Sequence, residues 1–422
     1  MSATSDLSRR SFLGVSALAA STPLTAGSAG SPGGTRREPL RLGLIGCGGR
    51  GGGATRNALQ TDVDVKLVVM GDAFLDRLET KLEALKGVEA IADRIDVPAE
   101  RRFVGFDAYQ KVLASDVDVV ILATPPHFRP AQFEAAVVAG KHVFMEKPVA
   151  VDGQGVQQVL HAAQLAKEKN LKVGVGLQRR HHQGYRDTIQ RVHDGEIGEI
   201  LAARAFWNSG SLWHKPRQDS WSDMEWQLRN WLYFTWLSGD HIVEQHIHNL
   251  DVINWAKQAH PVKAHGMGGR QVRVQPAFGH IFDHHAVQFE YEDGSVMFSQ
   301  CRQMPGCAFR VSEHLIGTRG TADFLRRGQQ MKVDGKSWRY DGPKQVPFQQ
   351  EHDDLFAAIR ADTPYNEAEY GAQSTLTAIM GRMATYSGKD VTWDQALASE
   401  RLGPAAYEWG GLAVPAVPTP GA

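Results

Sequence analysis

A glycine-rich loop directly after a short apolar segment constrains this chain more than any other feature of its 422 residues. The apolar segment spans residues 40–45 and the loop, GCGGRG, spans residues 46–51, after which a helical pattern begins. In this strand–turn–helix context, G-x-G-x-x-G spacing is typical of a dinucleotide-binding fold. Gly46 permits the tight turn, Gly48 lets the backbone approach a pyrophosphate, and Gly51 lets the helix pack closely on the strand. We expect free N–H groups at the helix start to bind the phosphates.

An acidic residue supports this interpretation. A second apolar segment, residues 65–70, ends in Gly71-Asp72, and Asp72 lies 21 residues after Gly51. At this distance a carboxylate can bind the ribose hydroxyls and would repel a 2′-phosphate, which favours NAD over NADP. The alternative is that Asp72 is a turn residue in an α/β protein that binds no nucleotide.

Predicted strands and helices alternate through the rest of the first half. The strands are residues 102–104, 117–123, 141–145 and 172–177, and the helices are residues 75–85, 108–113, 130–139 and 155–167. This alternation predicts a Rossmann-like, doubly wound parallel sheet, which we assign to residues 39–178. Thr124-Pro125-Pro126-His127 and Glu146-Lys147-Pro148 each follow a strand, at the carboxyl edge where ligands bind in such sheets.

The first 38 residues are predicted to be a targeting segment and linker, outside the fold. Ser8-Arg9-Arg10-Ser11-Phe12-Leu13 resembles a twin-arginine export signal, and a small-residue stretch at 26–34 suits cleavage. The apolar stretch at 12–24 is too short to span a bilayer. We therefore expect export by the twin-arginine route to the periplasm or the extracellular space. The alternative is a disordered tail with an accidental arginine pair.

The charge balance excludes some partners. The 46 Lys and Arg residues face 47 Asp and Glu residues, a net charge of -1, which argues against binding nucleic acid or an anionic membrane. No other apolar stretch approaches about 20 residues, so we expect no membrane association in the mature form. A small carbohydrate is the expected partner, and the chain is expected to form a homo-oligomer.

From Arg179 onward the alternation stops. Predicted strands at residues 198–208, 286–290, 295–300 and 308–316 follow one another, with a hairpin turn at 291–294 and another turn at 318–321. Strands in series predict an α+β domain with an open, mostly antiparallel sheet, which we assign to residues 179–388. Helices at 350–360 and 368–387 are expected to pack on the body. Residues 389–422 form a C-terminal extension, predicted to be extended after Gly403.

One predicted helix, residues 239–255 (GDHIVEQHIHNLDVINW), carries a polar face. Asp240, Glu244, His248 and Asp251 fall at helical spacing on it. A histidine one turn from a carboxylate suits proton transfer, because the carboxylate orients the ring and stabilises its charged form. The alternative is the solvated face of an amphipathic helix.

Together, the export signal, the glycine loop and the motifs at 124–127 and 146–148 resemble the glucose–fructose oxidoreductase/inositol dehydrogenase (Gfo/Idh/MocA) family, from about Arg41 to Gly388. The resemblance implies a Rossmann domain followed by an open, mostly antiparallel sheet. It also implies that the substrate lies between that sheet and the nicotinamide, where Lys147 reaches both.

The resemblance also implies the site residues. Family members carry D-x-G-x-H-x-x-D where this chain has residues 244–251; Glu244 replaces the first Asp and His246 replaces the Gly. The implied catalytic residues are Lys147, His248 and Glu244. His248, helped by Lys147, takes the hydroxyl proton, and Glu244 orients these groups or relays the proton. The expected cofactor contacts are Gly46, Gly48, Gly49, Arg50, Gly51, Asp72, Thr124, Pro125, His127, Glu146 and Lys147, and the expected substrate contacts are Arg179, Trp231, His246 and Asp251.

Three further clusters are ambiguous. Six of the ten tryptophans lie between residues 206 and 236, which suits sugar stacking, a small core of an insertion, or a subunit interface. His280, His284 and His285 lack suitably spaced thiol or carboxylate partners, so we expect no metal site and place them on strands facing the cleft or solvent. Cys301 and Cys307 are candidates for a disulfide after export, whereas Cys47 is expected to be a small packing residue.

These features predict an NAD-dependent oxidoreductase acting on a carbinol carbon of a sugar, polyol or glycoside. Because an exported protein has no ready nicotinamide pool, we expect the cofactor to stay bound and be recycled. Three versions remain open. One exchanges hydride between two sugars. Another is an NAD-dependent glycosidase or lyase that oxidises transiently and eliminates the aglycone, with His246 as an additional base. The third is a non-enzymatic sugar sensor, against which the presence of Lys147 and His248 argues.

Overall fold

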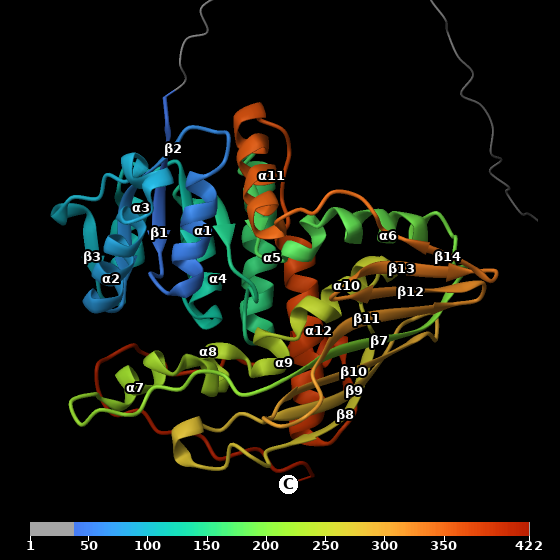
Figure 1. Ribbon diagram of the computed structural model, residues 1–422. Helices are drawn as coiled ribbons and strands as arrows, with labels where there is room; N and C mark the ends of the chain where they lie inside the picture. The colour runs from blue at the N-terminus through green and yellow to red at the C-terminus, as the bar shows by residue number, and fades with distance from the viewer. Residues whose placement is uncertain (1–37, 422) are drawn as a thin grey trace, which may run out of the picture. The chain divides into compact units, whose positions relative to one another are not determined.

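In the computed structural model, which describes residues 38–421, the first half of the chain forms a six-stranded parallel sheet (Figure 1). Its strands are β1 (Leu40–Ile45), β2 (Val65–Asp72), β3 (Arg102–Val104), β4 (Val119–Leu122), β5 (His142–Met145) and β6 (Val173–Val175). They are ordered β3-β2-β1-β4-β5-β6, so the direction of winding reverses between β1 and β4. The predicted doubly wound Rossmann sheet is confirmed, and the reversal marks the crevice where such sheets bind ligands.

Five helices alternate with these strands: α1 (Gly49–Leu59), α2 (Leu75–Lys86), α3 (Ala108–Ala114), α4 (Arg129–Val138) and α5 (Gly153–Glu168). All four residues of β4 are buried, as expected for a strand covered on both faces. Asp152 caps α5 by accepting a hydrogen bond from Gly155 N, and Pro130 lies in the first turn of α4, where proline needs no N–H partner.

The second half forms a nine-stranded sheet ordered β14-β13-β12-β11-β7-β10-β9-β8-β15. The strands are β7 (Ile200–Ser209), β8 (Lys263–Gly269), β9 (His284–Glu290), β10 (Val296–Gln303), β11 (Arg310–Gly317), β12 (Gly320–Leu325), β13 (Gly328–Val333), β14 (Lys336–Arg339) and β15 (Val391–Thr392). Neighbouring strands are antiparallel except β7 and β10, which confirms the predicted mostly antiparallel sheet.

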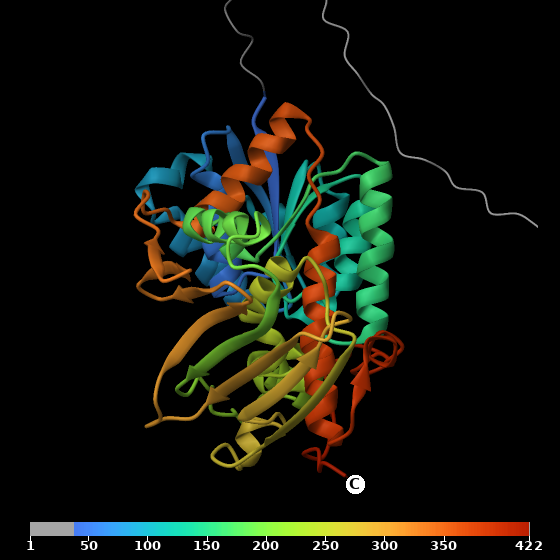
Figure 2. The same cartoon turned by 90° about the vertical axis from the view of Figure 1, so that its right-hand side faces the viewer.

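Helix α12 (Ala368–Ser387) joins the two sheets (Figure 1, Figure 2). Small residues let it approach both. A Cβ at Gly371 would lie 3.1 Å from Val175 of β6, and a Cβ at Gly381 would lie 2.8 Å from Phe289 of β9. Strand β8, which the sequence analysis missed, is rich in glycine for a similar reason, because a Cβ at Gly266 would lie 2.9 Å from Thr385 of α12.

The remaining helices include α6 (Gln183–His193), α7 (Asp223–Arg229), α8 (Thr235–Ser238) and α11 (Pro347–Ala361). The predicted helix at 239–255 is wrong in one respect, because it is broken into α9 (His241–Glu244) and α10 (Ile247–Lys257). Gly239 and Asp240 have φ angles of 76° and 73°. Because residues with a positive φ cannot continue a right-handed helix, α8 ends before them and α9 begins after them. Asp240 therefore does not share a helical face with Glu244 and His248.

An insertion, residues 212–232, and the C-terminal segment, residues 402–412, pack together; we call these two segments the clasp. Most tryptophans of the predicted cluster lie in the insertion or a few residues after it. They form part of a small apolar core that includes Trp226, Trp236 and Phe234, against which Leu402 and Leu412 pack. The C-terminal segment lacks helices and strands but is bound to the insertion, since Gly410 O accepts from Met224 N, and to the first domain, since Leu402 N donates to Asp152 Oδ2 at 2.9 Å. The predicted targeting segment lies outside the described residues. Among residues 38–421, no helix is long and apolar enough to cross a bilayer.

Candidate active site

A cavity of about 720 Å³ opens where the carboxyl ends of β1, β2 and β4 face the second domain. Nine residues predicted from the sequence line it: Gly46, Gly48, Gly49, Arg50, Asp72, Thr124, Pro125, Trp231 and Glu244. Its size is in the range of small-molecule and cofactor sites. The parallel sheet brings together residues from four distant loops, because parallel strands end at one edge.

The glycine loop has the shape that a pyrophosphate requires. Gly46 has a φ of 98°, and a Cβ there would lie 2.5 Å from Thr124 N. A Cβ at Gly51 would lie 1.9 Å from Gly46 O, so neither position accepts a side chain without movement of the backbone. At Gly48 and Gly49 a Cβ would meet nothing, so bare backbone faces open space, and no side chain caps α1. These residues fit the phosphates of a dinucleotide.

Asp72 stands at the end of β2 with its carboxylate held in place. Oδ2 accepts from Cys47 N at 2.6 Å, and Oδ1 accepts from Phe74 N at 2.9 Å. Burial raises the pKa of Asp72, while these two N–H groups and the charge of Arg77 oppose the rise. A fixed carboxylate at this edge fits the ribose hydroxyls of a nucleotide. Cys47 is buried beneath the loop, as a small packing residue would be.

Lys147 and Glu244 meet across the boundary between the two domains. Lys147 follows β5 in the first domain, and Glu244 is the last residue of α9 in the second. Lys147 Nζ lies 3.0 Å from Glu244 Oε1 and also donates to the Glu244 carbonyl oxygen. Both side chains are mostly buried, with 12% and 17% exposure. Glu244 lines the cavity, and Lys147 lies directly behind it.

His248 lies in the first turn of α10, beside an aromatic and cationic stack. Its ring stacks on Trp207 with 6.0 Å between centroids, and the Arg179 guanidinium lies 5.7 Å from the Trp207 centroid. Its Nδ1 is buried and has no hydrogen-bond partner among the described residues. Burial, reinforced by the charges of Lys147 and Arg179, holds the pKa of His248 well below its usual range. The imidazole is therefore neutral near pH 7.

Arg179 is held from behind by Glu313, with which it forms an ion pair. Glu313 is fully buried and also accepts from Tyr185 Oη at 3.2 Å and from Asn249 Nδ2. Burial raises the pKa of Glu313, although the Arg179 charge opposes the rise. These contacts fix the Arg179 guanidinium beside Trp207, outside the nucleotide cavity.

Two residues that were predicted to contact the cofactor do not line the cavity. One supports a cavity residue from behind, and the other contacts the clasp. Glu146 accepts from Arg50 at 2.9 and 2.6 Å, so it positions a cavity residue. His127 turns away from the cavity, and its Nε2 lies 2.7 Å from Tyr407 Oη of the clasp. Because burial lowers the pKa of His127 to about 4, it is a neutral packing residue here.

Two of the predicted substrate contacts are also placed away from the cavity. His246 lies in the break between α9 and α10, fully buried, with Nε2 2.8 Å from Ser299 Oγ of β10. Burial lowers its pKa to about 3. Asp251 is buried and accepts from Arg180 at 2.8 to 3.1 Å. Helical spacing alone could not show these partners, because they come from other elements.

Apart from Trp231, the clasp residues that enclose the cavity were not predicted from the sequence. Arg229 ion-pairs with Asp76 at 3.0 Å and places its guanidinium 4.1 Å from the Phe74 ring. Trp409 stacks on Phe106 at 4.6 Å and contacts Phe74 at 5.4 Å. Isolated aromatic and charged residues in loops carry no periodic signal, so their convergence could not be predicted.

The fold and the cavity define a protein with a Rossmann-type nucleotide site that residues 212–245 of the second half help to line. Residues 40–177 match the model of the Gfo/Idh/MocA oxidoreductase family with an NAD-binding Rossmann fold, and residues 185–323 match the Gfo/Idh/MocA C-terminal domain. The chain belongs to this family.

Curated relatives cover part of the chain. The inositol 2-dehydrogenase of Pseudomonas syringae is 27% identical over 256 residues, 61% of this chain and 65% of the relative. The 2,7-anhydro-N-acetylneuraminate hydratase of Escherichia coli is 29% identical over 227 residues, 51% of this chain and 56% of the relative. The chain spans between 44% and 65% of the length of three inositol 2-dehydrogenases that it matches.

Solved structures share the fold over most of the chain. Scyllo-inositol dehydrogenase from Lactobacillus casei, with bound NAD(H) and scyllo-inositol, has a TM-score of 0.64 at 21% identity, covering 85% of this chain and 100% of that one. The aldose-aldose oxidoreductase from Caulobacter crescentus has a TM-score of 0.65 at 19% identity, covering 84% and 100%.

Proposed function

We propose that this protein is an NAD-dependent oxidoreductase that acts on the carbinol carbon of a sugar, polyol or glycoside. The observation that carries the proposal is the ion pair of Lys147 with Glu244, a residue that lines the nucleotide cavity, with the charge of Lys147 acting on the buried His248. Bound NAD supplies the hydride acceptor. His248, held neutral, accepts the hydroxyl proton, and Lys147 donates a hydrogen bond to the same oxygen. Glu244 keeps the ammonium of Lys147 in place.

We also propose that the nucleotide stays bound between turnovers. The clasp closes over the Asp72 side of the cavity through the Arg229–Asp76 ion pair and through the stacking of Trp409 on Phe106 and Phe74. A nucleotide enclosed in this way can leave only after these contacts open. Slow release is what an exported protein needs, because it has no external pool of nicotinamide.

A redox-neutral reaction is the second candidate, in which transient oxidation makes a neighbouring C–H acidic. Bound NAD would supply the hydride acceptor and, at the end, the hydride donor. In between, a base of the protein would remove the C–H proton, so that the C–O bond to the leaving group breaks and water adds in its place. The Glu244 carboxylate lines the cavity and is the base available there, whereas His246 is buried against Ser299. That relatives include enzymes named as hydratases supports this candidate.

Export by the twin-arginine route and self-association remain proposals. The outer face of the nine-stranded sheet exposes Leu201, Met267 and Phe298, which supports association of two copies through this face. Export is supported by the sequence pattern around Arg9 and Arg10 alone.

Product analysis without added cofactor tests the proposed activity. Purified protein is incubated with a panel of glycosides and polyols, and the products are identified by mass spectrometry. We expect conversion by the wild type, a loss of about 10²- to 10⁴-fold in Lys147→Ala, and no loss in Lys167→Ala, which removes an exposed lysine. Binding of sugars without any conversion would favour the sensor.

A further inference from the structure

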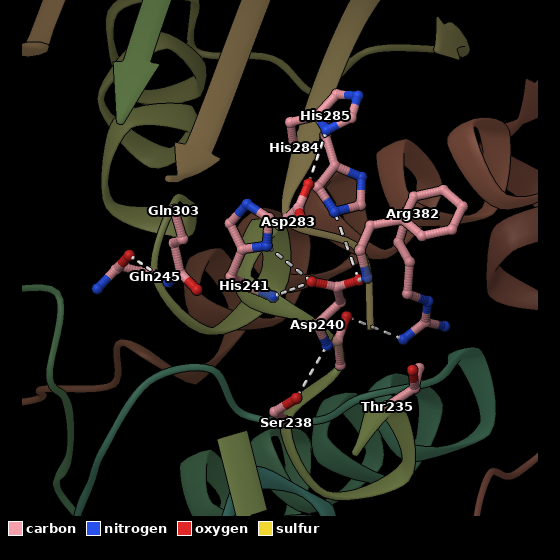
Figure 3. Close-up of polar contacts among 12 residues, drawn as sticks. Thr235, Ser238, Asp240, His241, Gln245, Asp283, His284, His285, Gln303 and Arg382 are labelled. Atoms are coloured by element: carbon pink, nitrogen blue, oxygen red, sulfur yellow. Dashed lines mark hydrogen bonds and ion pairs between the residues drawn. The ribbon is translucent and has the colours of Figure 1, made fainter. Parts of the chain in front are cut away.

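Asp240, His241 and His285 lie together in the core of the second domain (Figure 3). Asp240 precedes α9, His241 is its first residue, and His285 lies on β9. All three are buried, and one ligand atom from each lies within 4.8 Å of the others. In the part of the chain that the structure describes, no other three His, Cys, Asp or Glu residues form such a group. The prediction that His285 faces the cleft or solvent is therefore wrong, because Asp240 and His241 come from a distant segment.

The carboxylate of Asp240 lies at the centre of this group and has no lysine or arginine partner among the described residues. Oδ2 of Asp240 accepts from Phe282 N at 2.9 Å and from Tyr386 Oη at 2.6 Å. Among the described residues no lysine or arginine ion-pairs with it, and Arg382 donates instead to carbonyl oxygens, including that of Val151. An ionised carboxylate in the core requires a positive partner.

The hydrogen bonds around His285 determine which ring nitrogen faces this carboxylate. The Thr385 hydroxyl donates to the Arg382 carbonyl oxygen at 2.9 Å, so its oxygen accepts from His285 Nδ1 at 2.9 Å. In a neutral ring the lone pair is then on Nε2, which has no hydrogen-bond partner and lies 3.4 Å from Asp240 Oδ2. A lone pair facing a carboxylate oxygen is repulsive unless a cation lies between them.

His241 completes the group from the other side. Its Nδ1 lies 2.8 Å from Asp240 Oδ1. A neutral imidazole is the form that binds metals. The Nε2 of His241 has no hydrogen-bond partner among the described residues.

We propose that Asp240, His241 and His285 bind one divalent first-row transition-metal ion, with Zn²⁺ the best match. Two imidazoles and one carboxylate are typical zinc ligands. Ligand atoms about 2.05 Å from a metal are about 2.9 Å apart in an octahedron and about 3.3 Å apart in a tetrahedron. His241 Nδ1 lies 2.8 Å from Asp240 Oδ1 and His285 Nε2 lies 3.4 Å from Asp240 Oδ2, so each imidazole is at a ligand-to-ligand distance from one oxygen of a carboxylate that would bind through both.

The ion would have a structural role. None of its three ligands lines the nucleotide cavity. The site ties the start of α9 to β9, and the hydrogen bond from Tyr386 adds α12. Because α9 ends at Glu244, the ion fixes the helix that presents this carboxylate to Lys147.

Metal uptake by the full-length protein tests the proposal. The protein is dialysed against a chelator and titrated with Co²⁺, whose visible absorption reports coordination, and zinc in the untreated protein is measured by mass spectrometry. We expect about one ion per chain. His285→Ala and Asp240→Asn should weaken binding by more than about 100-fold. The matched control is His284→Ala, which removes a neighbouring, partly exposed histidine that contacts Asp283 and should bind like the wild type.

Two results would overturn the proposal. Wild-type protein that takes up no Co²⁺ would show that His285 is instead an imidazolium paired with Asp240, and this result needs no variant to fold. Equal metal content in the wild type, His284→Ala and His285→Ala would show that any bound metal lies elsewhere.

Discussion

Replacing His181 with glutamine should remove a stabilisation that depends on pH. His181 ends a short 3-10 turn, Gln178–His181, and its side chain is 2% exposed. Nδ1 lies 2.7 Å from Asp354 of α11, and Nε2 lies 3.1 Å from Glu367, next to α12. Although burial alone would lower it, these two carboxylates raise the pKa of His181 from 6.5 to about 9. At about 1.4 kcal/mol per pKa unit, the charged ring stabilises the fold by about 3 kcal/mol.

The direction of the pH dependence follows from the sign of this change. Because the pKa is higher in the folded state, the stabilisation is complete below about pH 6.5, decreases as the pH rises through 9, and is absent above about pH 10. The free energies of unfolding of the wild type and His181→Gln, measured in urea, should therefore differ most at pH 6. The difference between them should be about 3 kcal/mol smaller at pH 10. The control is His161→Gln, on the exposed face of α5. Its free energy of unfolding should differ from that of the wild type by the same amount at every pH. A difference for His181→Gln that does not change with pH would refute the reasoning.

Three further changes test the nucleotide site. Asp72→Ala should weaken NAD binding and reduce discrimination against NADP, measured by calorimetry, because the ribose contact and the repulsion are both lost; unchanged selectivity would contradict this role. Gly51→Ala should prevent NAD binding, since its Cβ would lie 1.9 Å from Gly46 O, and should lower the free energy of unfolding by about 1–3 kcal/mol. Trp409→Ala removes two aromatic contacts worth about 0.5–1.5 kcal/mol each, so bound nucleotide should dissociate about 5- to 150-fold faster in a dilution assay. An unchanged dissociation rate would exclude a retaining role for the clasp.

Local patterns were sufficient to predict the first domain and part of the site. The glycine loop, Asp72 and Lys147 each follow a buried parallel strand, and parallel strands deliver such residues to one edge. The parts that the sequence could not predict depend on contacts between distant segments. Asp240 has a positive φ that helical periodicity does not report, and its partner His285 lies on another element.

The clasp shows a second limit of prediction from local patterns. Trp409 contacts aromatic rings in two loops of the first domain, and neither loop has a regular apolar period. Strand β8 was not predicted because glycine is untypical of strands. Its glycines are required by the close approach of α12. Of the cysteines proposed as a disulfide, Cys301 is buried and Cys307 is exposed, and both are free in the structure.

The most direct test of the central claim is the absorbance of the nicotinamide that co-purifies with the protein. A glycoside or polyol is mixed with freshly purified protein in a stopped-flow instrument without added NAD. We expect about one nucleotide per chain. It should be reduced on mixing with a substrate in the wild type, and about 10²- to 10⁴-fold more slowly in Lys147→Ala and His248→Ala. Protein that carries no nicotinamide, or carries it unchanged with every compound in the panel, would contradict the account.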